Sequence, residues 1–281
     1  MNGASGGTKI NSVLAYPGAK NFLAQWIIPH FPPHRIYVEP FGGSAGVLIR
    51  KQPCYLEVYN DANGELVNFF RVLRDREKML ELIRLLDLTP YSKEEHSSAY
   101  AEDECTDVER ARRTFVKSFQ SFGTRGLFEN CGWRRVVKLD ECGGPKRWRA
   151  NIDCIEAACK RLSEVMVEND DALKVIDRHD SPETLFYLDP PYLGDYSKMY
   201  RFGSHEEEWH QRFLDRICRL EGMAVLSGCP HPLYDEALKE WKREERTAGS
   251  ISHVLKTEVL WMNANAERAL AERESEIEKF F

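Results

Sequence analysis

An acidic residue, two prolines and a tyrosine follow one another directly after an apolar run, in the segment LFYLDPPY. Consecutive prolines remove two backbone donors and lock two φ angles, so this corner has little conformational freedom. Its residues are Asp189, Pro190, Pro191 and Tyr192. A strand before the corner would place it at the carboxyl end of a sheet, where open α/β sheets bind ligands. The sequence therefore predicts a carboxylate, a carbonyl oxygen and an aromatic ring held rigidly beside a ligand.

These groups suit the activation of an amino group on a flat ring. The lone pair of such a nitrogen is delocalised, so the nitrogen is a poor nucleophile until it begins to pyramidalise. Two acceptors, the Asp189 carboxylate and the Pro190 carbonyl oxygen, would favour that geometry and stabilise the developing positive charge. The ring of Tyr192 is suited to stacking on a base extruded from a duplex. The alternative is a rigid turn without chemistry, because proline-rich turns after strands are common.

A glycine-rich segment follows a second apolar run, in YVEPFGGSAGV. Glu39 ends the run, and Gly42 and Gly43 precede a segment that we expect to be helical. Glycines let the backbone approach a ligand closely, and a helix N-terminus supplies donors for a carboxylate. The spacing differs from the G-x-G-x-x-G loop, which disfavours a nicotinamide-dependent dehydrogenase. S-adenosylmethionine, with a carboxylate and an ammonium but no phosphate, suits an acid beside this loop. A packing turn is the alternative.

Acidic residues also end two further apolar runs. Asp61 closes EVYND, 22 residues after Glu39, and is placed to accept hydrogen bonds from ribose hydroxyls. Asn169, Asp170 and Asp171 follow the run EVMVE, where an acceptor for the amino group of a cofactor adenine is expected. For Asp61, and for one of the later acids, capping of the following helix is the competing explanation.

The elements that must position these residues alternate as strand, loop and helix on both sides of a basic middle zone. Runs this apolar suit strands that are covered on both faces, so the pattern predicts a parallel α/β sheet. The expected strands are RIYVEP, CYLEVYND, EVMVEN, TLFYLDPPY and GMAVLSG, the expected helices are VLIRK and GELVNFFRVL, and ISHVL with KTEVLWMN is expected to form an edge hairpin. The polar tail after Asn265 is expected to form an exposed helix.

The middle zone interrupts the two halves of the sheet. We therefore predict one domain made of residues 1–73 and 163–281, with a small, mostly helical inserted domain at 74–162. Within the insertion, DVERARRTFVKSFQSFG carries an apolar stripe at helical spacing, which predicts packing rather than a binding surface. The stripe consists of Val108, Ala111, Phe115, Phe119 and Phe122.

A basic segment, Cys131–Asn151, lies in the second half of the insertion. Its charge is +4, because six basic residues stand against Asp140 and Glu141, in a chain whose net charge is −6. The basic residues are Arg134, Arg135, Lys138, Lys146, Arg147 and Arg149. Spaced along a β-hairpin, they would meet DNA phosphates, with one or two reading guanine edges. Trp133 or Trp148 would support the hairpin or wedge the duplex; a solvated charged face is the alternative.

Composition narrows the class of protein. The chain has 281 residues, of which 42% are hydrophobic and 30% charged, and it has no apolar stretch of the roughly 18 residues that a membrane span needs. Its start is polar and glycine-rich, unlike a secretory signal. None of the eight cysteines forms a C-x-x-C pair, so we expect reduced thiols, no metal site and a cytoplasmic protein.

Taken together, YPGAK, EPFGG, the basic insertion and DPPY occur in the order found in the DNA adenine methyltransferases of the Dam type, which this chain resembles over nearly its whole length. AVLSGCPHPLY and TEVLWMN also resemble later strands of that family. One departure is Ala19, where a second glycine is common. The resemblance implies a Rossmann-like class I methyltransferase sheet with an inserted target-recognition domain that carries a β-hairpin.

The resemblance further implies methyl transfer from S-adenosylmethionine to the N6 amino group of adenine in double-stranded DNA, after base flipping. The corner 189–192 would hold the target base. Cofactor contacts are implied for Tyr16 and Lys20, which enclose it, for Glu39, Phe41 and Gly43 at its methionine end, for Asp61 at its ribose and for Asp171 at its adenine.

Two alternatives remain at this stage. One is an amino-methyltransferase that acts on cytosine N4 or on RNA, although cytosine enzymes often carry serine in place of Asp189. The other is a non-catalytic DNA-binding protein of the same fold. The recognition sequence, a role in restriction–modification and the oligomeric state stay open.

Overall fold

The computed structural model describes residues 13–123, 125–135, 144–193, 207–249 and 255–278. The chain divides into two compact units, each assembled from separate stretches. We call one the helical unit (Met1–Phe22, Gly43–Arg50 and Gly64–Glu164) and the other the sheet unit (Leu23–Gly42, Lys51–Asn63 and Val165–Phe281).

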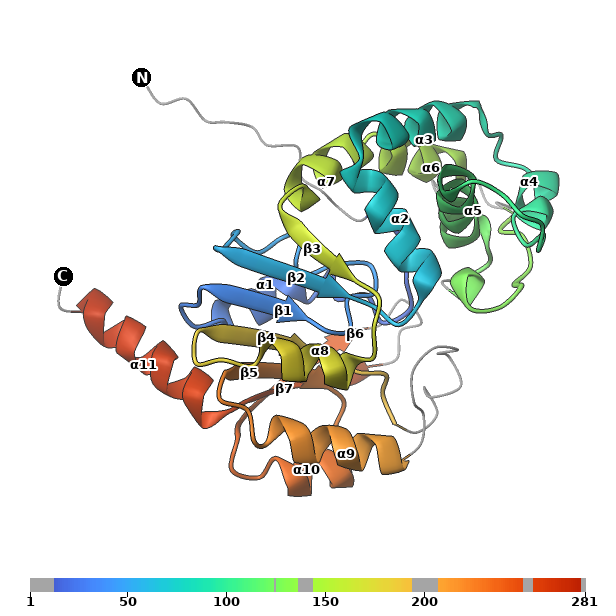
Figure 1. Ribbon diagram of the computed structural model, residues 1–281. Coiled ribbons are helices and arrows are strands. Elements are labelled where there is room, and N and C mark those ends of the chain that lie inside the picture. The colour runs from blue at the N-terminus through green and yellow to red at the C-terminus, as the bar shows by residue number, and fades with distance from the viewer. Residues whose placement is uncertain (1–12, 124, 136–143, 194–206, 250–254, 279–281) are drawn as a thin grey trace. The chain divides into compact units, whose positions relative to one another are not determined.

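The sheet unit is built on a seven-stranded sheet with the order β3-β2-β1-β4-β5-β7-β6 (Figure 1). The first five of these strands are parallel, whereas β7 runs antiparallel to both of its neighbours. The strands are β1 (Ile36–Glu39), β2 (Leu56–Asn60), β3 (Val165–Glu168), β4 (Thr184–Leu188), β5 (Met223–Gly228), β6 (Lys242–Gly249) and β7 (Leu255–Met262). The expected Rossmann-like α/β fold is confirmed.

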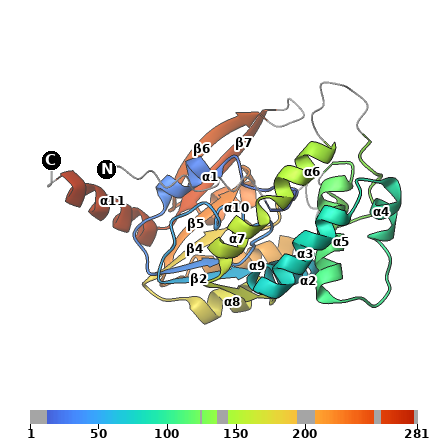
Figure 2. The ribbon, with the colours of Figure 1, turned by 90° about the horizontal axis from the view of Figure 1, so that it is seen from above.

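Every residue of β4 and β5 is buried, as expected for strands that are covered on both faces. The edge hairpin differs from its prediction. Figure 2 shows it as a pair of long strands, β6 and β7, and β6 is the charged segment KREERTAG rather than ISHVL. Residues 251–254 of ISHVL lie outside the described residues. An edge strand tolerates charged side chains because it is exposed, so β6 has no apolar signal in the sequence.

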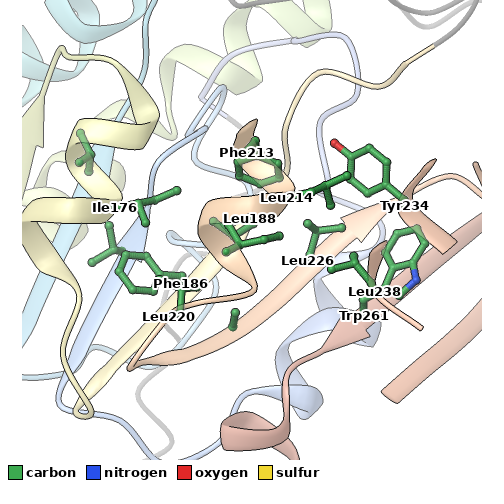
Figure 3. Close-up of a cluster of buried hydrophobic side chains, with 14 of the residues drawn as sticks. Ile176, Phe186, Leu188, Phe213, Leu214, Leu220, Leu226, Tyr234, Leu238 and Trp261 are labelled. Carbon is green, nitrogen blue, oxygen red and sulfur yellow. The ribbon is translucent and has the colours of Figure 1, made fainter. Parts of the chain in front are cut away.

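One face of the sheet is covered by α8 (Ala172–His179), α9 (Glu207–Ile217) and α10 (Pro232–Ala237). Figure 3 shows Phe186, Leu188 and Leu226 of the strands packed against apolar side chains of these helices and of the segments that follow them. The helical members of this cluster include Val175, Ile176, Phe213, Leu214, Ile217 and Tyr234. Burial of this apolar surface is the main stabilising contribution in this layer.

The remaining helices of the sheet unit are α1 (Ala24–Ile27), the 3-10 helix η1 (Ile28–His30) and α11 (Ala264–Glu278). After η1 the chain places Phe31 against the rings of Tyr37 and Tyr187, with ring centroids 5.7 Å apart in both pairs. Arg273 of α11 donates a hydrogen bond to the Phe31 carbonyl oxygen at 3.2 Å. The described side chains of α11 are mostly exposed, which confirms the expected polar helix.

A buried ion pair lies beside Tyr37. The Lys51 ammonium is 2.5 Å from the Glu57 carboxylate, both side chains are at most 5% exposed, and the same ammonium lies 4.5 Å from the centre of the Tyr37 ring. Charges this deeply buried depend on each other, because neither can recover the hydration it has lost.

The helical unit centres on α5 (Asp107–Gln120), which packs against α2, α3, α4 and α6. Thr106 caps the start of α5 by accepting a hydrogen bond from the Glu109 amide at 3.2 Å. The other helices of the unit are α2 (Gly64–Arg74), α3 (Arg76–Leu88), α4 (Lys93–Ser98), the 3-10 helix η2 (Arg125–Leu127), α6 (Gly144–Ile152) and α7 (Ile155–Leu162). The segment VLIRK forms turns rather than the expected helix.

The predicted packing stripe on α5 is correct except at its end. Val108, Ala111 and Phe115 are buried, and the Phe119 ring lies 4.6 Å from that of Phe115. Phe122 is 74% exposed, so its assignment to the packing stripe was wrong. The reason is that α5 ends at Gln120, after which the extended chain pairs with the segment around Trp133.

None of the helices in the described ranges is both long and apolar enough to cross a membrane.

Removing one partner of the buried ion pair should destabilise the protein. We expect Lys51→Met to lower the free energy of unfolding by about 3–5 kcal/mol, because the Glu57 carboxylate stays buried without its ammonium partner. Urea denaturation measures this loss. The double variant Lys51→Met/Glu57→Leu should recover most of it, and equal destabilisation of both variants would contradict the coupling.

Candidate functional site

Acidic residues lie along one edge of the parallel sheet. Glu39 ends β1, Asp61 follows β2, Asp171 lies beyond β3, and Asp189 follows β4. Since these strands are parallel, their carboxyl ends meet at the same edge. From β1 the chain moves outward through β2 to β3, then returns to the other side of β1 as β4. Glu39 and Asp189 therefore flank the point at which the strand order reverses, where open α/β sheets bind their ligands.

Two asparagines tie the loops at this edge together. The Asn60 side-chain amide donates to the carbonyl oxygens of Pro40, at 2.9 Å, and Asp170, at 3.1 Å, and its oxygen accepts from the Asp170 amide at 2.9 Å. Asn169 donates to the Asp61 carbonyl oxygen at 2.7 Å. The segments that follow β1, β2 and β3 are thus held in register with one another.

Asp61 and Asp171 both bond to nearby backbone amides. Asp61 is buried, and its Oδ1 accepts from the Asn63 amide at 2.8 Å. Asp171 is exposed and caps α8 by accepting from the amides of Leu173, at 2.9 Å, and Lys174, at 3.3 Å. The capping explanation therefore holds for Asp171. It does not exclude a ligand contact, because a carboxylate offers about four lone-pair positions.

Glu39 is buried beside a tyrosine that the sequence did not single out. The Tyr37 hydroxyl donates to Oε2 of Glu39 at 3.1 Å. Residues two apart on a strand share a face, which brings the two side chains together. Burial, and then the negative charge of Glu39, raises the pKa of Tyr37 well above its ordinary value. Tyr37 therefore stays a neutral donor to the carboxylate.

The loop after β1 approaches its neighbours closely. A Cβ atom at Gly42 would lie 2.1 Å from a ring carbon of Tyr59, so only glycine fits there. The Gly42 amide donates to the Asn60 carbonyl oxygen at 2.8 Å. Phe41 packs edge-on against Phe213 of α9, with ring centroids 5.6 Å apart. Packing thus explains Gly42 and orients Phe41, while leaving the loop backbone at the carboxyl end of β1.

The other candidate cofactor residues belong to the helical unit. Within YPGAK, the Ala19 amide donates to the Tyr16 carbonyl oxygen at 3.2 Å, and Gly18 has a φ of 73°, as in a type II turn. Lys20 is buried and its ammonium donates to the Gly18 carbonyl oxygen at 3.1 Å. Gly43 has a φ of 50°, and a Cβ atom there would lie 3.0 Å from the Tyr16 ring.

The proline corner is held by hydrogen bonds to its acid and its tyrosine. The Ser227 hydroxyl donates to Oδ1 of Asp189 at 2.9 Å. The Tyr192 hydroxyl lies 3.1 Å from Oε2 of Glu258 and 3.4 Å from Oδ1 of Asp189. Burial, followed by the charges of Asp189 and Glu258, raises the pKa of Tyr192 well above its ordinary value, so its hydroxyl remains a donor.

Sequence reasoning did not identify Ser227 or Glu258. Ser227 is a buried hydroxyl in the otherwise apolar run GMAVLSG, and Glu258 is an acid within the apolar run TEVLWMN. A polar side chain inside an apolar strand needs a partner, and this was the available signal. The identity of the partner depends on pairing between distant strands.

A hollow of about 310 Å³ adjoins the corner. Pro190, Tyr192 and Leu193 line one side, residues 227–231 after β5 line another, and Tyr234 of α10 completes it. The corner thus borders a space that has an aromatic and partly apolar lining.

Of the basic residues, Lys146, Arg147 and Arg149 lie on helix α6, not on the expected hairpin. Their side chains are exposed, and Arg149 forms an ion pair with Asp87 of α3. Arg135 is exposed, and the Arg134 amide donates to the Gln120 carbonyl oxygen at 2.7 Å. Lys138 lies outside the described residues.

The two tryptophans of the basic segment pack within the helical unit. Trp148 is 5% exposed and lies edge-on to Phe115, with ring centroids 5.0 Å apart. Trp133 is partly buried and its ring centroid lies 5.9 Å from that of Tyr91. Trp148 is therefore a packing residue rather than an exposed wedge. In the described part of the chain, no group of three or more His, Cys, Asp or Glu residues is arranged to hold a metal ion.

Comparison with protein families agrees with this arrangement. The model of the D12 class N6 adenine-specific DNA methyltransferase family matches residues 16–219. The matched span begins at Tyr16, includes the Asp189–Tyr192 corner and ends just after α9. It covers well over half of the chain. The chain belongs to the D12 class of N6 adenine-specific DNA methyltransferases.

Proposed function

We propose that this enzyme transfers the methyl group of S-adenosylmethionine to N6 of an adenine flipped out of double-stranded DNA, and that the Asp189–Tyr192 corner holds that adenine. Membership of the family makes the protein an enzyme of DNA adenine methylation. The observation that carries the finer proposal is the placement of Glu39 at the end of β1 and of Asp189 directly after the neighbouring strand β4, on either side of the strand-order reversal.

The residues at the carboxyl ends of β1 and β2 fit the proposed cofactor. S-adenosylmethionine supplies an electrophilic methyl group on a positively charged sulfur. The buried Glu39 carboxylate suits its ammonium group, and Asp61 suits its ribose hydroxyls. Phe41 is proposed to line the methionine end and Asp171 to accept from the adenine amino group. The roles of Tyr16, Lys20 and Gly43 rest on the resemblance alone.

In the proposed chemistry, the corner activates the target amino group. The Asp189 carboxylate and the Pro190 carbonyl oxygen accept its two hydrogens, which favours a tetrahedral nitrogen and stabilises the positive charge that develops there. Pro190 and Pro191 keep these acceptors rigid. The Tyr192 ring, anchored through its hydroxyl to Glu258, stacks on the extruded base. The hollow beside the corner supports this proposal because Pro190 and Tyr192 line it.

DNA binding is proposed for the inserted domain, residues 74–162. The exposed side chains of Arg135, Lys146 and Arg147 support it, since phosphate contacts require accessible cations. Arg134, Lys138 and Arg149 complete the proposed set. Arg149 should contribute less than its neighbours on α6, because Asp87 already neutralises part of its charge.

Asp189→Ala should keep cofactor binding and lose methyl transfer by about 10²–10³-fold, because one of the two activating acceptors is gone. Calorimetry measures the affinity for S-adenosylmethionine, and mass spectrometry of nucleosides from treated DNA and RNA measures the product. Asp177→Ala, which removes an exposed carboxylate of α8, is the matched control and should transfer normally. Methylcytosine as the sole product, or normal transfer by Asp189→Ala, would contradict the proposal.

Arg147→Ala should weaken DNA binding about equally for all sequences and lower the slope of log K against log salt by about 0.9, because one phosphate contact is lost. Fluorescence anisotropy over a salt series measures both quantities. Arg149→Ala removes an arginine two residues further along the same helix and should change the slope less, because Asp87 already pairs with Arg149. A larger change for Arg149→Ala would contradict the assignment of phosphate contacts.

A further inference from the structure

Two buried tyrosines lie on the neighbouring central strands of the sheet unit. Tyr37 on β1 is 0% exposed and Tyr187 on β4 is 1% exposed. Both rings pack against Phe31 with centroids 5.7 Å apart, so Phe31 restrains the two tyrosines together. Hydroxyl groups buried this deeply need hydrogen-bond partners. The partner of Tyr37 is Glu39 itself, and the partner of Tyr187 is Ser227, which contacts Asp189.

Tyr37 contacts its acid directly. Its hydroxyl donates to Oε2 of Glu39 at 3.1 Å, in fully buried surroundings. A neutral tyrosine is a donor that brings no charge of its own, so it orients the Glu39 carboxylate without neutralising the negative charge.

Tyr187 reaches its acid through one serine. The Ser227 hydroxyl has a single proton and donates it to Oδ1 of Asp189 at 2.9 Å. The contact of 2.8 Å between the Tyr187 hydroxyl and Ser227 Oγ must then be donated by the tyrosine. Burial is the largest cause that raises the pKa of Tyr187, followed by the charge of Asp189, so Tyr187 keeps its proton.

We propose that Tyr37 and Tyr187 are separate positioning residues, Tyr37 orienting Glu39 for the cofactor and Tyr187, through Ser227, orienting Asp189 for the target amino group. This inference rests on the proposed function. Without the Tyr37 hydroxyl, the Glu39 carboxylate loses a donor directly and gains rotational freedom. Without the Tyr187 hydroxyl, Ser227 loses the contact that directs its own proton toward Asp189, so the orientation of Asp189 weakens indirectly. Since each tyrosine serves a different acid, the two losses should affect different steps.

The test compares Tyr37→Phe with Tyr187→Phe, each of which removes one buried hydroxyl from a central strand. Calorimetry measures the affinity for S-adenosylmethionine in the absence of DNA, and rapid quench at saturating cofactor and DNA measures the rate of a single methyl transfer. Thr184→Val, which removes a buried hydroxyl at the amino end of β4 that bonds to the His179 carbonyl oxygen, is the control. Thermal unfolding verifies that each variant is folded.

We expect Tyr37→Phe to weaken cofactor binding about tenfold with transfer at saturation nearly unchanged. Tyr187→Phe should slow transfer about tenfold with cofactor affinity nearly unchanged, and Thr184→Val should change neither. Ser227→Ala should reproduce the Tyr187→Phe result, whereas Ser227→Thr, which keeps the hydroxyl, should restore transfer. If Tyr187→Phe fails to fold, the comparison of Ser227→Ala with Ser227→Thr still tests the contact from Ser227 to Asp189. If Tyr37→Phe is destabilised, its affinity for S-adenosylmethionine is measured by calorimetry at low temperature.

Two results would overturn the inference while the proposed function stands: no effect of either phenylalanine variant in an active enzyme, or equal effects of both on affinity and transfer. Equal effects would indicate a purely structural role. A wild-type protein that binds no S-adenosylmethionine would overturn the proposed function and this inference together.

Discussion

The site depends on one topological constraint, the reversal of strand order between β1 and β4. Because parallel strands carry their carboxyl ends to one edge, Glu39 and Asp189 come together although 150 residues of chain separate them. Sheet hydrogen bonding holds neighbouring strands about 4.8 Å apart, so the strand ends that carry these two acids lie side by side. The loops that follow β1, β2 and β3 and the capped helix α8 all connect to this edge of the sheet.

The acids at the sheet edge are contacted by hydroxyl groups that are buried within the sheet unit. Tyr37, Tyr187 and Ser227 are buried, yet each has a hydrogen-bond partner at the site. Burying a hydroxyl without a partner costs about 1–3 kcal/mol, so these bonds also stabilise the folded sheet. Stability and site geometry therefore share the same contacts.

Several residues serve the fold and remain compatible with a ligand role. Asp171 caps α8, Phe41 packs on α9, and Gly42 makes room for Tyr59. A structural explanation for each of these residues therefore does not decide against function. The carboxylates of Glu39 and Asp189 share one feature: each accepts a hydrogen bond from a buried neutral hydroxyl, that of Tyr37 or that of Ser227.

The sequence alone determined the parallel strands, the rigid corner and the order of the motifs. These features are local, since apolar runs, consecutive prolines and glycine turns act within a few residues of chain. Tertiary structure decided the rest. The partner of Ser227, the exposure of Phe122 and the helix that carries Arg147 depend on which distant segments pack together. The sequence did not predict the edge strand β6, because an exposed strand lacks the apolar pattern by which strands are recognised.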